Sequence, residues 1–181
     1  LLLPLLVPRL PLLLLQLLIL ILQILLLLQL LLLLLLLFIF LQDCPTTVIP
    51  AIAIPVSLIG AMAFAKVFGF SINTLTMFAL VLATGLVVDD GIVVVEGVVT
   101  KIGQGMKAKP AAFEAMKELS GALISTSLVL IAVFLPVTFF PGATGVMYKQ
   151  FALVIIFSVA ISTFNALSFS PSMSAILLRP Q

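Results

Sequence analysis

Two adjacent aspartates, Asp89 and Asp90, are the residues of this chain best placed to do chemistry. They lie inside an apolar run from Leu75 to Val99 and are its only charged residues before Glu96. A run of that length crosses a bilayer as one helix. Each acid at the centre of such a helix costs about 2.5–3.5 kcal/mol on insertion scales. Two neighbouring acids at that cost indicate a function rather than packing alone.

The chemistry open to such a pair is the exchange of protons or cations. Adjacent carboxylates in a medium of low dielectric cannot both be ionised cheaply unless a cation lies near them. A lysine or arginine from another helix would stabilise the ionised pair, and protonation would release it and let the helices shift. Lys66 and Lys149 belong to predicted helix ends. The sequence therefore predicts that the cation comes from a part of the protein outside this chain.

Three neighbours of the acids are candidate supporting residues. Gly85 and Gly91 flank the pair, and small residues allow another backbone to come close. Glu96 follows Asp89 by seven residues and shares its stripe of the helix, although it is also near enough to the helix end to be interfacial. Asp89 and Asp90 are about 100° apart around the axis. The alternative to a proton site is a buried polar pair held by hydrogen bonds from neighbouring helices.

The composition excludes several classes of protein. The chain is 64% hydrophobic and 8% charged, whereas a soluble domain carries about 25% charged residues. We therefore expect a membrane protein embedded in lipid. The net charge of +2 is too small for binding nucleic acid. The chain has no histidine and only Cys44, so we expect no metal site, no nucleophile–base pair and no enzymatic activity.

The apolar runs predict an all-α membrane protein, a bundle of about five transmembrane helices with a short amphipathic cytoplasmic helix. Ser71 or Asn73 would cap the third span, and Pro171 would kink or end the deep part of the fifth. The amphipathic helix would start at Pro110 and lie on the headgroups, with an apolar stripe of Phe113, Met116 and Leu119. The five spans are expected at about 12–41, 48–68, 73–99, 119–139 and 148–178.

Basic residues indicate how these spans are oriented. With five spans, the segments 42–47 and 100–117 and the C-terminal end share one side of the membrane. That side would hold Lys101, Lys107, Lys109, Lys117 and Arg179, against Lys66, Lys149 and Arg9 on the other. An excess of lysine and arginine is typical of the cytoplasmic side. We therefore expect the 100–117 segment to be cytoplasmic.

The first 37 residues differ from the rest of the chain. They are dominated by leucine, with an unbroken block from Leu30 to Leu37, whereas the later spans mix apolar residue types. We interpret much of residues 1–37 as placeholder sequence that ends in a transmembrane helix. Residues 38–181 would then be a partial transmembrane domain. The numbering starts without methionine, so we expect the chain to be a fragment of something longer.

Several segments together resemble the resistance-nodulation-division (RND) transporters, in the hydrophobe/amphiphile multidrug efflux branch. Residues 69–78 (GFSINTLTMF) and 85–96 (GLVVDDGIVVVE) are similar to the fourth transmembrane helix of that family. Further similarity lies in residues 49–56 (IPAIAIPV), 132–136 (AVFLP), 142–151 (GATGVMYKQF) and 178–180 (LRP). The resemblance covers about residues 38–180 and implies helices 2–6 of the first half of a twelve-helix transporter.

This resemblance implies a proton-driven antiporter of the bacterial inner membrane that exports drugs or other amphiphiles. The family uses a proton gradient rather than a cofactor and is normally trimeric, with a periplasmic adaptor and an outer-membrane channel as partners. Its paired aspartates, which match Asp89 and Asp90 here, meet a lysine and an arginine of the second half. The alternative is a non-transporting membrane subunit or truncated relative with a structural role in a larger assembly.

The sequence departs from the family pattern close to the acids. Gly91 stands where alanine is usual, and Gly97 where asparagine is usual. Val99 and Thr100 replace the charged residues that usually follow. These departures concern the cytoplasmic end of the helix that carries the aspartates.

Overall fold

The computed structural model describes residues 10–41, 44–70 and 73–178, and its regular elements are all helices. They are α2 (Leu10–Leu41), α3 (Cys44–Val67), α4 (Thr74–Gly103), α5 (Ala108–Phe134), the 3-10 helix η1 (Leu135–Phe139) and α6 (Ala143–Leu177). The prediction of an all-α membrane protein is therefore confirmed. Within the described residues, four helices are long and apolar enough to cross a bilayer: α3, α4, α5 with η1, and α6. The described apolar stretch of α2, Gln16–Leu32, is shorter.

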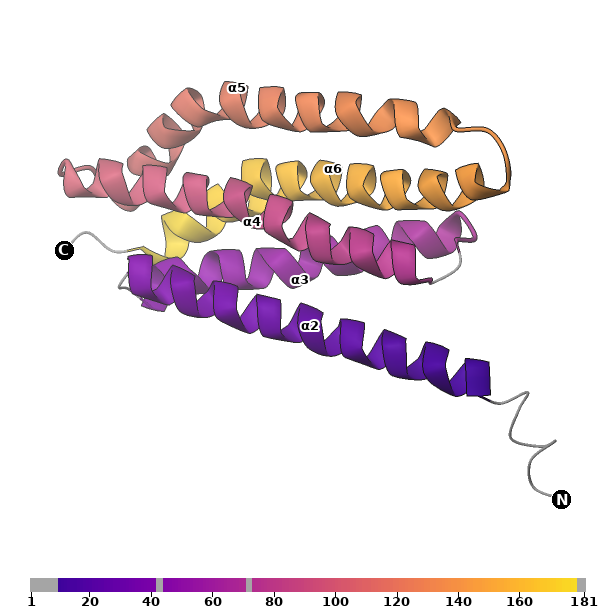
Figure 1. The fold of residues 1–181 in the computed structure, drawn as a ribbon. Coiled ribbons are helices and arrows are strands. Elements are labelled where there is room, and N and C mark those ends of the chain that lie inside the picture. The colour runs from indigo at the N-terminus through magenta and orange to yellow at the C-terminus, as the bar shows by residue number, and fades with distance from the viewer. Residues whose placement is uncertain (1–9, 42–43, 71–72, 179–181) are drawn as a thin grey trace, which may run out of the picture.

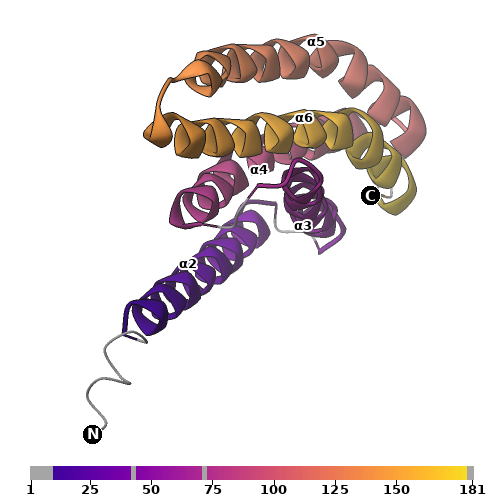
Figure 2. The ribbon, with the colours of Figure 1, turned by 90° about the vertical axis from the view of Figure 1, so that its right-hand side faces the viewer.

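The helices form a bundle in which α6 holds a central position. It packs against α3, α4 and α5, while α2 contacts α3 and α4 at the edge. Figure 1 shows α4 and α6 in the middle, α5 on one side and α2 with α3 on the other, and Figure 2 shows α2 leaving the bundle at its N-terminal end. The largest described core cluster joins α4 to α6 through Met77, Leu80, Ile155 and Val159.

Polar side chains connect the helices as well. Asn165 on α6 donates to Ser57 on α3 at 3.0 Å, and Ser127 on α5 pairs with Thr163 on α6 at 2.5 Å. Gln29 on α2 donates to the carbonyl oxygen of Val81 at 3.2 Å. Such hydrogen bonds between membrane helices contribute about 0.6 kcal/mol each on average. They fix the register of helices whose apolar surfaces would otherwise slide on one another.

The start of α4 is fixed by the predicted cap. The Asn73 side chain accepts from the Thr76 backbone N–H at 2.8 Å, and the Thr76 hydroxyl accepts from the Asn73 backbone N–H at 2.8 Å. This reciprocal pair is a capping box. The other candidate, Ser71, lies outside the described residues. The helix runs beyond the predicted end near Val99 to Gly103, and the left-handed Gly105 (φ 91°) then turns the chain.

The prediction of a separate amphipathic helix is wrong. The segment from Pro110 and the span from Leu119 belong to one helix, α5, because Pro110 lies in its first turn and nothing after it interrupts the ladder. Figure 1 shows this continuous ribbon bending in its first turns. Of the predicted apolar stripe, Met116 and Leu119 pack against core clusters, whereas Phe113 is 75% exposed. The fully buried residues at this end of α5 are Ala111, Ala112 and Ala115.

The ends of the helices alternate as the topology prediction requires. The C-terminal end of α2, the N-terminal end of α3, the α4–α5 turn and the C-terminal end of α6 lie at one end of the bundle (Figure 1). That end carries Lys101, Lys107, Lys109 and Lys117, and its assignment to the cytoplasm stays a prediction. Arg9 and Arg179 lie outside the described residues. Pro171 does not end α6, which continues to Leu177 with its last turns bent off the axis.

Close packing between α4 and α5 explains one departure in the sequence. A Cβ atom on Gly97 would lie 2.6 Å from Leu119 Cδ1 on α5, so a side chain at residue 97 must displace the tip of Leu119. A Cβ atom on Gly91 would lie 3.6 Å from Pro50 Cβ, which is ordinary contact. A side chain is therefore accommodated at residue 91 as the structure stands, whereas at residue 97 it requires Leu119 to change its conformation.

This difference gives a paired prediction. Gly97→Asn is expected to destabilise the protein by about 1–3 kcal/mol, because the amide must displace Leu119 from a packed interface. Gly91→Ala is the matched control and is expected to be neutral within about 0.5 kcal/mol. Thermal unfolding of the two purified variants in one detergent measures both changes. Equal melting temperatures for the variants and the parent would contradict the close α4–α5 approach.

Candidate functional site

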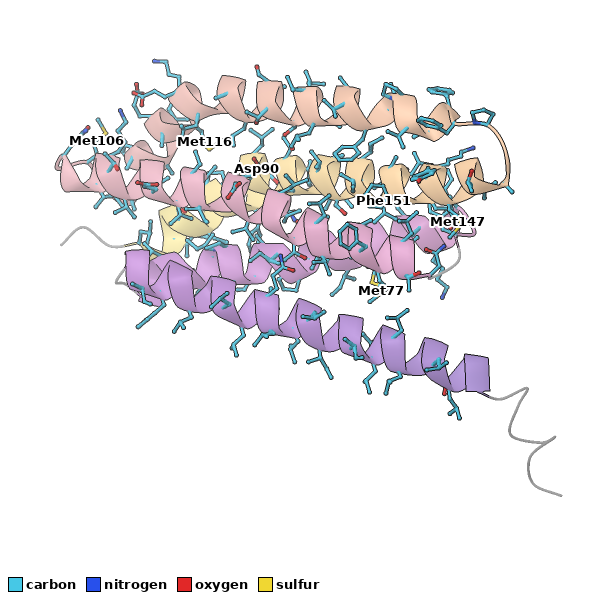
Figure 3. All side chains as sticks on the ribbon, in the orientation of Figure 1. Met77, Asp90, Met106, Met116, Met147 and Phe151 are labelled. Carbon is cyan, nitrogen blue, oxygen red and sulfur yellow. The ribbon has the colours of Figure 1, made fainter. Side chains whose placement is uncertain are left out.

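The two aspartates lie midway along α4 on different faces of the helix. Asp89 is exposed and Asp90 is half-buried. Figure 3 shows Asp90 in the middle of the bundle beside α6. The difference follows from helix geometry, since successive residues are about 100° apart around the axis. As a result, one acid contacts the neighbouring helix and the other points to a face that the described chain leaves uncovered.

Asp90 is tied to α6 by a hydroxyl group. The Ser162 hydroxyl lies 3.2 Å from Asp90 Oδ2 and 3.1 Å from the carbonyl oxygen of Val87. Ser162 itself is only 4% exposed. A hydroxyl has one hydrogen to donate, so Ser162 can serve only one of these two acceptors at a time. Both acceptors belong to α4, so the charge of Asp90 decides which of its two oxygens receives the hydrogen from α6.

Asp89 lies on an uncovered face of α4 that we call the open stripe: Phe78, Leu82, Gly85, Asp89, Val93, Glu96 and Thr100. Gly85 is half-buried and the other six are exposed. Their spacing of three and four residues places them on one side of the helix. A Cβ atom on Gly85 would meet nothing within 4 Å in the described chain. The opposite face is buried, which leaves the open stripe as the surface of α4 available to another element.

The glycines and Glu96 do not form one cluster with the acids. Gly91 is buried and packs against Pro50 of α3, whereas Gly85 lies on the open stripe. Glu96 is exposed at the border of a cavity of about 360 Å³ between α4 and α5. Lys101 and Glu118, which form an ion pair at 2.6 Å, line the same cavity. The roles of Gly85, Gly91 and Glu96 as supporting residues stay predictions.

Within the described residues, neither aspartate forms an ion pair. The ion pairs that the described part of the chain makes are Lys101–Glu118 and Lys117–Glu114, at the basic end of the bundle. The described residues also contain no group of three or more histidine, cysteine, aspartate or glutamate side chains that could hold a metal ion. Two carboxylates in the middle of a membrane helix thus have one hydroxyl partner and an open face.

Ser162 is a site residue that the sequence did not single out. It is one of several hydroxyl and amide side chains on α6, and most of them bond locally to the preceding turn, as Ser158, Thr163 and Ser168 do. Nothing in the sequence distinguishes Ser162 from these, because the feature that matters is its register against Asp90 on another helix. No signal short of the packing of α4 against α6 could have found it.

Comparison with known proteins identifies the family of this helical bundle. A family model described as the AcrB/AcrD/AcrF family matches residues 21–181. The chain belongs to this family of RND transporters. The multidrug export protein AcrF of Escherichia coli K12 is 43% identical over 145 residues, which is 79% of this chain and 14% of that protein. The assignment to the RND transporters, in their multidrug efflux branch, is therefore confirmed.

Two more RND transporters are similar to this chain over nearly the same length. The toluene efflux pump membrane transporter TtgB of Pseudomonas putida is 44% identical over 144 residues, and the multidrug resistance protein MdtF of Escherichia coli K12 is 43% identical over 143 residues. The chain spans about 14% of the length of these curated relatives. It corresponds to a helical segment of a multi-pass membrane transporter.

Proposed function

We propose that this chain is the part of a proton-driven exporter of drugs or other amphiphiles in which Asp89 and Asp90 carry the protons. The observation that carries the proposal is the placement of the pair midway along α4, with Asp90 bonded to Ser162 of α6 and Asp89 on the open stripe. Two acids at that depth are costly. Their cost is offset only if protonation, or a neighbouring cation, neutralises them during the working cycle.

Ser162 provides a physical link between protonation and helix contact. An ionised Asp90 attracts the single hydroxyl hydrogen more strongly than a neutral carbonyl does. When Asp90 takes up a proton, that advantage is lost and the hydroxyl returns to the carbonyl oxygen of Val87, 3.1 Å away. A neutral Asp90 can in turn donate its own O–H to the Ser162 oxygen, so the direction of the hydrogen bond between the α4 carboxyl group and α6 would reverse with the charge of Asp90. Such a differential contact is what lets proton binding shift the balance between two conformations.

The open stripe is where the compensating cation would approach. A helix that packs on Gly85 and Asp89 could bring a lysine or arginine to the acids without displacing any described side chain. We propose that this helix belongs to the second half of the same transporter. We further propose a homotrimer in the bacterial inner membrane that works with a periplasmic adaptor and an outer-membrane channel. The proton gradient takes the place of a chemical cofactor.

Reconstitution tests the proton coupling directly. The transporter that contains this chain is placed in liposomes with a fluorescent drug and a pH-sensitive dye. An imposed pH gradient is expected to drive drug movement against a counterflow of protons, and a protonophore is expected to stop both. Drug movement that continues at full rate without a pH gradient would refute the antiport proposal.

Ser162→Ala tests the link between Asp90 and α6. Loss of one hydrogen bond to a charged group is expected to slow export by about tenfold without stopping it. Ser168→Ala is the matched control, since its hydroxyl is exposed and bonds to the carbonyl oxygen of Phe164 on the same helix. Initial rates of dye export measure both variants. An unchanged rate for Ser162→Ala would show that the hydroxyl plays no part in coupling.

A further inference from the structure

An apolar cavity lies at the end of the bundle opposite the basic α4–α5 turn. The C-terminal half of α3, the turn that follows it, the start of α4 and Val154 of α6 line a half-open cavity of about 680 Å³. Cavities of about 300–1,000 Å³ are typical of sites that hold one small molecule. This cavity shares no residue with the aspartate site.

The walls of the cavity are apolar and differ in exposure. Leu80 and Val154, which are 6% and 2% exposed, belong to the core cluster and form its inner part. Ile59 and Met62 on α3 are 67% and 40% exposed and also line it. Phe70, which packs against the core cluster, contributes an aromatic surface. The cavity therefore extends from the packed core to an apolar surface of α3.

One charged side chain lines this apolar space. Lys66, in the last turn of α3, is exposed and forms no ion pair within the described part of the chain. The described acids all lie in the second half of α4 or the first turns of α5, so none of them neutralises this end of the bundle. A lysine in the last turn of a helix is favoured by the helix dipole. The dipole accounts for Lys66 but not for the cavity beside it.

We propose that this cavity binds a single-chain carboxylate amphiphile from the membrane, such as a long-chain fatty acid. The carboxylate would pair with the Lys66 ammonium group, and the acyl chain would lie against Met62, Phe70 and Leu80. The orientation matches the bilayer, because Lys66 is at a helix end near the headgroups and the apolar wall extends inward. A cavity of this size suits one acyl chain better than a two-chain phospholipid. The inference does not rest on the proton site.

Photolabelling tests this assignment. The transporter that contains this chain is reconstituted in neutral lipid and exposed to a palmitic acid that carries a diazirine on its chain. Light-dependent adducts are expected on peptides that contain Met62, Phe70 or Leu80, and excess palmitate is expected to compete with them. Adducts confined to other peptides, or equal competition by hexadecanol or by phosphatidylglycerol, would overturn the proposal.

Substitutions at Lys66 test the role of its charge, and a substitution at Ala63 tests the role of the cavity. Lys66→Gln is expected to weaken labelling by about three- to tenfold, the loss of one partly exposed charge-assisted contact, and Lys66→Arg is expected to retain it. Lys149→Gln removes another exposed cation from the same end of the bundle and is expected to leave labelling unchanged. Ala63→Phe fills the cavity and is expected to abolish labelling. Unchanged labelling in Lys66→Gln, or a crosslink from the cavity to another part of the same polypeptide, would overturn the proposal.

These variants also distinguish the cavity from the proton site. Lys66→Gln lies on an exposed helix end, so the variant is expected to fold and to keep proton-coupled export. Size-exclusion profiles and melting temperatures check the folding of each variant. Loss of labelling with export retained supports a separate lipid site. Loss of both in Lys66→Gln would show that the residue acts through the transport cycle, and the assignment of an independent site would be wrong.

Discussion

Asp90→Asn is expected to reduce drug export to the level of cells without the transporter. The substitution keeps the size of the side chain and an oxygen that can accept from Ser162, 3.2 Å away in the parent. It removes the ionisable group, so a proton can no longer bind and leave. Asp89→Asn is expected to have the same effect, because its exposed carboxyl group is the one that a cation approaching the open stripe would meet first. Dye accumulation in a pump-deficient strain measures both losses.

Control variants distinguish a loss of proton coupling from a loss of assembly. Glu118→Gln removes the 57% exposed carboxylate that pairs with the 16% exposed Lys101, and is expected to leave export intact because this pair lies at the basic end of the bundle, away from the aspartates. Glu96→Gln tests the predicted supporting role of Glu96, which lies on the open stripe, and is expected to lower export partly. Oligomer assembly is compared by native electrophoresis. Normal export by both aspartate variants would end the proton-site proposal, and failure to assemble would favour the structural alternative.

Gly145→Ala is expected to destabilise the protein strongly. A Cβ atom on this buried glycine would collide with the backbone carbonyl oxygen of Phe140 in the turn before α6. Backbone cannot rotate away as a side-chain tip can, so the turn between η1 and α6 must open. Overpacking of this kind costs about 1–3 kcal/mol. The central position of α6 in the bundle would spread the disturbance to its contacts with α3, α4 and α5.

Gly121→Ala is the matched control for this prediction. Gly121 lies inside α5, where a Cβ atom would meet nothing within 4 Å of the described chain. Alanine in a helix interior is favoured over glycine by about 0.5–1 kcal/mol, so this variant is expected to be as stable as the parent or slightly more stable. Thermal unfolding in a common detergent compares the two. A Gly145→Ala variant as stable as Gly121→Ala would show that the turn is looser than the structure indicates.

Local patterns predicted the elements because membrane helices are determined by short stretches of sequence. A run of about 20 apolar residues must satisfy its backbone internally and therefore forms a helix. The Asn73 cap follows from residues within one turn, whereas α4 runs past its expected end near Val99 to Gly103. The main error arose in α5, where the polar segment that starts at Pro110 and the apolar run from Leu119 form one helix. Pro110 was expected in the first turn of a helix and lies there, where its missing N–H breaks no bond, but that helix was expected to be separate from the span at Leu119. Pro171 was expected to kink or end the deep part of its helix, and α6 continues to Leu177 with its last turns bent.

The sequence by itself determined that Asp89 and Asp90 share a membrane helix and that they point in different directions, and it predicts that their cation comes from outside this chain. These conclusions need only composition, helical periodicity and the cost of charge in lipid. Only the tertiary structure decided which acid contacts α6, that Ser162 is its partner, and that residue 97 faces the tip of Leu119 at close range while residue 91 meets Pro50 at an ordinary contact distance. Each of these depends on the register between two helices. That register is set by many weak contacts between residues far apart in the chain, which no local pattern records.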